Sequence, residues 1–251
     1  STRAPEPARG GPRARPADRP AGGRLDIQTD LLVVLGGTLL GAFASGLAGF
    51  AYALIASAVF LHVLPPREAA VLILLGSALA QCFTIWRFRA SMDLRRLLPF
   101  LLAGIAGVPL GTLALGVVPK DLVRDAEREG PEAGGRGADA AVGFAGGVLG
   151  GLAGLSGALP TVWCGLRGWS RDVQRAVFQP YILAIQLLAL ASLAMAGGVG
   201  AADLRRFALT VPAIVAGVLL GMRLYARIDE RRFRQVILVL LLASGAALVL
   251  F

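Results

Sequence analysis

The sequence is poor in the side chains that carry metal chemistry and covalent catalysis. Its 251 residues include one histidine, His62, and two cysteines, Cys82 and Cys164. A metal centre or a bis-histidine haem needs several such ligands, and a serine–histidine enzyme needs an acid to orient the histidine. We therefore expect no metal, no cofactor and no enzymatic activity.

Charge is also missing from long stretches of a chain that is 56% hydrophobic, with a mean hydropathy of +0.69. An uncharged apolar run of about 18 or more residues is typical of a membrane span. The chain has seven runs close to or above this length: Leu31–Leu61, Ala69–Trp86, Leu97–Val118, Ala140–Leu166, Ala176–Ala202, Phe207–Met222 and Val236–Phe251. They predict an all-α, polytopic helical membrane protein with about seven or eight apolar segments in the lipid bilayer.

The net charge of +9 lies between these runs. This placement is typical of membrane orientation and does not indicate nucleic-acid binding. Residues 1–30 begin with a stretch rich in Pro, Gly, Ala and Arg, and predict a disordered basic tail. No phosphate-binding glycine–lysine motif is present, which excludes direct use of ATP.

A glycine-rich phrase occurs twice, as GLAGFAYALI from Gly46 to Ile55 and as GLAGLSGALP from Gly151 to Pro160. The phrase DLRR is also repeated, from Asp93 and from Asp203. The chain therefore contains two related membrane repeats, 31–124 and 140–251, joined by a charged linker, 125–139. Such repeats are common in secondary transporters, whose substrate sites lie between them.

The first run, Leu31–Leu61, is too long for one straight crossing and too short for two, since a crossing needs about 20 residues. Ala140–Leu166 is also longer than one crossing, but by fewer residues. We expect each to be a helix that breaks at its glycines. Either each broken run crosses once, which we favour because the basic tail and the Arg87–Arg96 loop then share a side, or each is a re-entrant hairpin.

The chain resembles the TauE/SafE family of membrane transporters, also called sulfite exporters. The resemblance is carried by GLAGFAYALIASAVFLHVLPPREA and GVPLG in the first half, and by GGVLGGLAGLSGALPTVWCGLRGWSRDVQRAVFQ and RLYARIDERRFRQ in the second. It implies a bacterial inner-membrane transporter of small sulfur-containing or organic anions. Relatives usually have a fourth apolar helix after the position of PKDLVR, where this chain has a charged stretch.

An anion can be bound by half-helix N-termini, by hydroxyl groups and by amides. The candidate substrate-binding residues lie at or after a break, or are polar groups within an apolar helix: Ser45, Gly46, Gly49, Tyr52, Gln81, Gly154, Ser156, Gly157, Thr161, Gln179 and Gln186. The glycines could instead serve close helix packing. Gln81 and Gln186, which we expect to face one another across the repeat axis, could instead join helices without a ligand.

Arg175 begins an apolar run and could attract the anion, or could reach the lipid headgroups as an interfacial arginine. We expect an exporter of small anions such as sulfite or sulfonates, with its site between the repeats. The alternative is a membrane scaffold or binding protein that does not transport. Small-residue faces could also support a homo-oligomer.

Overall fold

The computed structural model describes residues 25–113, 135–153 and 156–250, and the part it describes is all-helical. The helices are α1 (Leu25–Ala48), α2 (Tyr52–Val63), α3 (Pro66–Phe88), α4 (Leu94–Leu113), α6 (Arg136–Ala153), α7 (Ala158–Leu166), α8 (Arg171–Met195), α9 (Ala201–Tyr225) and α10 (Glu230–Leu250), with the short 3₁₀ helix η1 (Arg89–Ser91). The predicted tail (1–30) and linker (125–139) overlap the starts of α1 and α6, and residues 1–24 and 125–134 lie outside the described residues.

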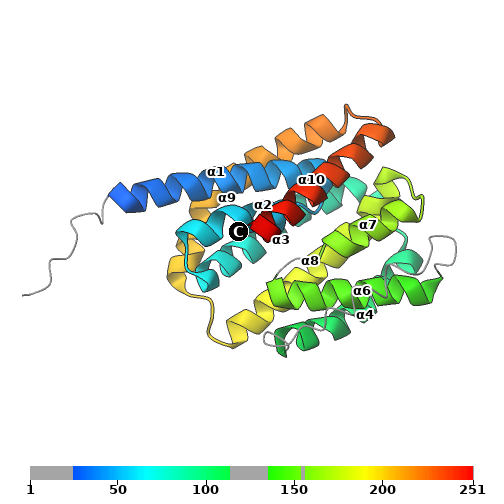
Figure 1. Ribbon diagram of the computed structural model, residues 1–251, viewed down its shortest axis with the longest axis horizontal. Helices are drawn as coiled ribbons and strands as arrows, with labels where there is room; N and C mark the ends of the chain where they lie inside the picture. The colour runs from blue at the N-terminus through cyan, green and yellow to red at the C-terminus, as the bar shows by residue number, and fades with distance from the viewer. Residues whose placement is uncertain (1–24, 114–134, 154–155, 251) are drawn as a thin grey trace, which may run out of the picture.

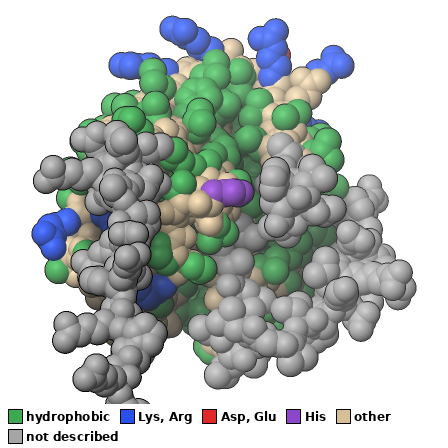
Figure 2. Space-filling view, turned by 60° about the vertical axis from the view of Figure 1, so that its left-hand side comes forward, with side chains coloured by type: hydrophobic (Ala, Val, Ile, Leu, Met, Phe, Trp, Pro, Cys, Tyr) green, Lys and Arg blue, Asp and Glu red, His purple; other side chains and the backbone are tan. Residues whose placement is uncertain are grey.

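Four of the described helical segments are long and apolar enough to cross a membrane: Leu31–Ala48, Pro66–Ser91, Arg171–Met195 and Ala201–Tyr225. Large apolar side chains are widely exposed on the bundle, including Leu32 (70%), Leu102 (65%) and Leu242 (76%). Figure 2 shows a face on which hydrophobic side chains dominate the described surface and arginines gather along the upper edge. Such a surface suits lipid, because acyl chains cover it without loss of hydrogen bonds.

The long helices form three adjacent pairs. The central pair is α3 and α8, which run antiparallel: Phe88 and Ser77 of α3 meet Arg175 and Gln186 of α8. On one side of this pair α1 packs against α9, and on the other α4 packs against α6 (Figure 1). Each outer pair therefore combines a helix of the first repeat with a helix of the second, so the two repeats interlock.

Both outer pairs are parallel and depend on glycine at the same repeat position. A Cβ atom at Gly217 of α9 would lie 2.7 Å from Ala42 Cβ and 2.9 Å from Phe43 N of α1. A Cβ atom at Gly107 of α4 would lie 3.0 Å from Val148 N of α6. Glycine lets the two backbones approach closely, as in other membrane helix pairs.

The two broken runs are hairpins. The backbone of Gly41 lies close to Tyr52, and that of Gly37 lies close to Val59 and Phe60, so α2 returns antiparallel along α1. In the same way, Ser156 lies against Gly150, and Trp163 of α7 bonds Asp139 at the start of α6. The single-crossing arrangement that we favoured from sequence is therefore wrong, because α2 packs back along the helix it follows.

Most described arginines lie at one end of the bundle, the arginine-rich end, where α3, α7 and α9 finish and α4, α6, α8 and α10 begin. The arginine-rich end carries Arg87, Arg89, Arg95, Arg96, Arg136, Arg167, Arg171, Arg223, Arg227, Arg231, Arg232 and Arg234. At the opposite end Arg67 pairs with Asp203 and Arg206 pairs with Glu68. Because α1 is parallel to α9, it starts at this opposite end. The expectation that the tail shares a side with the Arg87–Arg96 loop concerns residues outside the described part of the chain.

The packing of α1 against α9 gives a direct test. We expect Gly217→Ala to lower the free energy of unfolding by about 1–3 kcal/mol, because the added methyl group overpacks a backbone contact. Gly36→Ala on α1 is the matched control, since a Cβ atom there meets nothing within 4 Å. Thermal unfolding of both variants in detergent would measure the difference, and equal melting temperatures would contradict the close approach.

Candidate substrate site at the two helix breaks

The first break is a left-handed glycine turn. Gly49 has φ +95° and donates its N–H to Ser45 O at 2.7 Å, which ends α1, and α2 begins three residues later. A Cβ atom at Gly49 would lie 2.8 Å from the Phe178 ring and 2.7 Å from the Gln179 amide. Both the backbone conformation and the space therefore require glycine at this position.

The carbonyl groups that end α1 are bonded by Arg175. Its NH1 donates to Leu47 O at 3.2 Å, and its NH2 donates to Gly46 O at 3.0 Å and to Ser45 O at 3.5 Å. With its amide oxygen turned toward the guanidinium, Gln179 accepts from Arg175 Nε at 3.1 Å and from NH2 at 2.9 Å. One side chain of α8 thus bonds the carbonyl groups at the C-terminus of α1, where the helix dipole is negative.

The Arg175 guanidinium is enclosed by aromatic rings. Its Cζ lies 4.5 Å from the centroid of Phe88 and 4.4 Å from that of Tyr225, and the side chain is fully buried. The interfacial interpretation of Arg175 does not describe this buried position, whereas attraction of an anion by its charge stays a prediction. The group does not reach the lipid headgroups, and its donors are engaged by protein oxygens.

The two repeat-related glutamines lie on the central helix pair but have different partners. Gln81 Nε2 donates to Gly49 O at 2.8 Å and so holds the first break from the α3 side. Gln186 Nε2 donates to Ser77 Oγ at 2.7 Å, one turn before Gln81 on α3. The expectation that the two amides face one another is therefore wrong: each bonds a different group, because α3 and α8 pair in a register offset by one turn.

The second break lies between α6 and α7. Ser156 and Gly157 form the turn before α7 and are buried, whereas Gly154 lies outside the described residues. Thr161, in the first turn of α7, donates its N–H to Gly157 O at 3.1 Å and is also buried. Pro160 has no N–H to donate, so Ala158 and Leu159 carry the first N–H groups of this short helix.

The two breaks meet beside the middle of α8. A Cβ atom at Gly157 would lie 3.0 Å from Phe50 Cβ, in the first break, and 2.7 Å from Ile182 Cδ1. One face of α8 thus passes both turns, with Arg175 and Gln179 at the first and Ile182 at the second. The hairpins enter from opposite ends of the bundle, and Phe50 and Gly157 make the contact between them.

Several polar groups at the breaks have no hydrogen-bond partner among the described residues. They are the hydroxyls of Ser45, Ser156 and Thr161 and the amide oxygen of Gln186, all buried. The N-termini of α2 and α7 also lack a side-chain cap. Buried groups of this kind cost free energy unless a ligand or water satisfies them, and they are the polar groups that a ligand at the breaks would meet.

The remaining candidates have structural contacts. Tyr52 is buried at the start of α2, where it packs against Gly76 and Gly41. Gly46 lies against α9, where its Cβ would be 3.0 Å from Val218 Cα. Sequence reasoning missed Phe50, Ser77 and Ile182, which complete the contact between the breaks; Phe50 sits inside the repeated phrase, the one signal that could have singled it out.

The family model for the sulfite exporter TauE/SafE matches residues 33–126 and again residues 122–248. The chain belongs to the TauE/SafE family. TauE/SafE proteins are transporters and not enzymes, so this chain is a multi-pass membrane protein of a transporter family. The two successive matches agree with the two repeats found in the sequence. No curated protein and no solved structure matches the chain.

The role of Arg175 can be tested by a charge-conserving change. We expect Arg175→Lys to destabilise the protein by about 3 kcal/mol or more, because one ammonium cannot bond the α1 carbonyls and Gln179 together and leaves buried acceptors unpaired. The control is Arg205→Lys, an exposed arginine at the opposite end of the bundle. Thermal unfolding in detergent reports both, and an Arg175→Lys protein as stable as the control would refute the capping role.

Proposed function

We propose that this TauE/SafE transporter exports small sulfur-containing or organic anions, such as sulfite or a sulfonate, through a site between its two repeats. The membrane would be the bacterial inner membrane. The arginine-rich end would face the cytoplasm, as the positive-inside rule favours.

The convergence of two uncapped half-helix N-termini carries this proposal. Phe50, two residues before α2, lies against Gly157, the residue just before α7. Each helix begins with backbone N–H groups that no side chain caps. Such N–H groups and the positive dipole ends attract anions. The unpartnered hydroxyls of Ser45 and Ser156 add donors of the kind that sulfite and sulfonate oxygens accept.

The capping of α1 by Arg175 supports the same function. A helix that ends beside an anion site would repel the anion through its C-terminal carbonyls. Arg175 engages three of these carbonyls and places a positive charge behind them. At the first break, the backbone N–H groups at the start of α2 are therefore free to bind an anion. The carbonyl groups at the end of α1 repel it less, because Arg175 bonds them.

The buried acids favour transport without a carboxylate relay. Asp139 and Asp203 are buried, but they lie in the first turns of α6 and α9, at the two ends of the bundle. Trp163 and Arg167 contact Asp139, and Arg67 and the Gly200 N–H contact Asp203. The membrane potential alone supplies about 2.3 kcal/mol per charge at 100 mV, which drives anion export.

A thermal-shift panel on the purified protein tests the proposed site. We expect sulfite or a sulfonate such as sulfoacetate to raise the melting temperature above the value in chloride at matched ionic strength, because a ligand of the folded form stabilises it. The melting temperatures in acetate and thiosulfate would show whether carboxylates or other sulfur oxyanions bind as well as sulfite or a sulfonate. If no anion exceeded chloride, and liposomes showed no flux, the non-transporting scaffold would replace the transporter.

A serine substitution locates the site. We expect Ser156→Ala to weaken anion binding about tenfold, since it removes one hydrogen bond to a charged ligand, while the melting temperature of the free protein stays close to that of the wild type. Ser192→Ala on α8 is the matched control, because that hydroxyl bonds only the backbone of its own helix at Leu188 O. Unchanged anion binding by Ser156→Ala would remove this hydroxyl from the site.

A further inference from the structure

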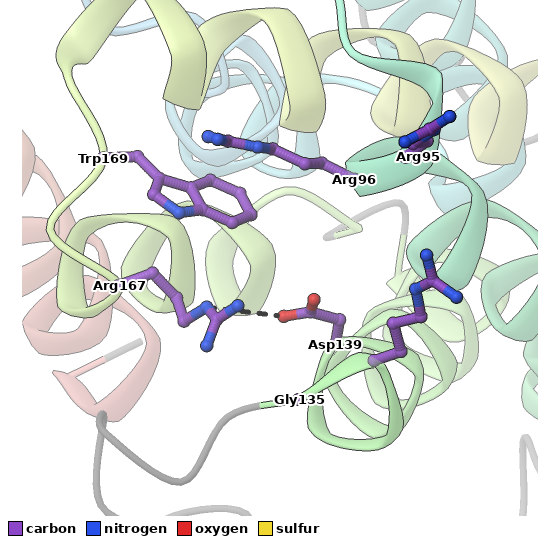
Figure 3. Close-up of a pocket in the computed structure, with 7 residues that line it drawn as sticks. Arg95, Arg96, Gly135, Asp139, Arg167 and Trp169 are labelled. Carbon is purple, nitrogen blue, oxygen red and sulfur yellow. Dashed lines mark ion pairs between the residues drawn. The ribbon is translucent and has the colours of Figure 1, made fainter.

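A polar pocket opens at the arginine-rich end, away from the helix breaks. It has a volume of about 350 Å³, which lies at the lower end of the range for sites that hold organic ligands. Its lining residues come from the starts of α4 and α6 and from the turn between α7 and α8: Arg95, Arg96, Gly135, Arg136, Asp139, Arg167 and Trp169 (Figure 3).

The charge of this pocket is strongly positive. Asp139, the one acid among the described lining residues, is buried, accepts a hydrogen bond from Trp163 Nε1 at 2.7 Å, and lies 3.9 Å from Arg167 Nε. Arg96 pairs with Asp93 at 3.2 Å, outside the lining. Arg95 and Arg136 are exposed, and neither forms an ion pair with another residue of the described part of the chain.

Trp169 forms an aromatic wall between two of the arginines. Its ring centroid lies 5.0 Å from Arg96 Cζ and 5.6 Å from Arg167 Cζ, and Figure 3 shows the ring between these side chains. Stacking of this kind fixes guanidinium groups in place and reduces the entropy that binding would cost. Tryptophan is also the residue that favours the boundary between headgroups and hydrocarbon.

Exposed leucines lie next to the pocket arginines in the sequence. Leu94 and Leu98 of α4 and Leu166 of α7, which neighbour Arg95 and Arg167 in the chain, are exposed at 64%, 45% and 55%. A ligand with a phosphate group at the arginines would therefore find apolar surface directly beside it. This pairing of a basic pocket with a leucine face fits a phospholipid better than a soluble anion.

We propose that this pocket binds the phosphodiester headgroup of an anionic phospholipid, with the acyl chains along Leu94, Leu98 and Leu166. Arg95, Arg96 and Arg136 bind the phosphate oxygens, and Asp139 with Arg167 and Trp163 holds the start of α6 against α7. The site is independent of the substrate site at the helix breaks, and its occupancy does not require transport.

The test uses the full-length protein in detergent with added lipid. Phosphatidylglycerol should raise the melting temperature more than phosphatidylcholine with the same acyl chains. The pocket variant is Arg95→Gln/Arg136→Gln, and the matched control is Arg231→Gln/Arg232→Gln, which removes the same charge from exposed arginines at the same end of the bundle. We expect the apparent dissociation constant for phosphatidylglycerol to rise about tenfold or more in the pocket variant and to change little in the control.

Three results would overturn the proposal. Equal protection by the two phospholipids would show that no headgroup is recognised. Equal weakening of phosphatidylglycerol binding in both variants would show a response to net charge alone. Protection by free glycerol phosphate or sulfite that matches phosphatidylglycerol, and that the pocket variant loses, would assign the pocket to a soluble anion.

Discussion

The need to satisfy backbone polar groups inside a membrane constrains this structure more than any other requirement. Each break in a helix exposes carbonyl and N–H groups that lipid cannot bond. At the first break, Arg175 and Gln81 reach in from α8 and α3 to bond the carbonyls of α1 and of Gly49. The hairpin α1–α2 therefore depends on the central helix pair, and its glycine turn could not persist at this depth without it.

This dependence extends across the repeats. Gln81 belongs to the first repeat, but Arg175 and Gln179 belong to the second, so the first break is completed by both halves of the chain. The parallel pairs α1–α9 and α4–α6 cross between the repeats in the same way. Because helices of the two repeats pair with one another, both hairpin tips lie against α8. The candidate site therefore lies between the repeats.

The two breaks are related but not equivalent. Arg175 and Gln179 fall at repeat positions that Ala70 and Leu74 occupy in the first half, so the second break has no matching pair of polar side chains on α3. The buried positive charge of Arg175 therefore has no counterpart at the second break.

The sequence by itself determined the helical membrane class, the two repeats, and the interruption of Leu31–Leu61 at its glycines, because length, hydropathy and glycine content are local properties. Only the tertiary structure decided that α2 returns along α1, that Gln81 and Gln186 have separate partners, and that Arg175 is buried. Those outcomes depend on the register of α3 against α8 and on which helices pack across the repeats. Helix pairing is set by contacts between residues far apart in the chain, and no local pattern in Arg175 or Gln186 encodes its partner.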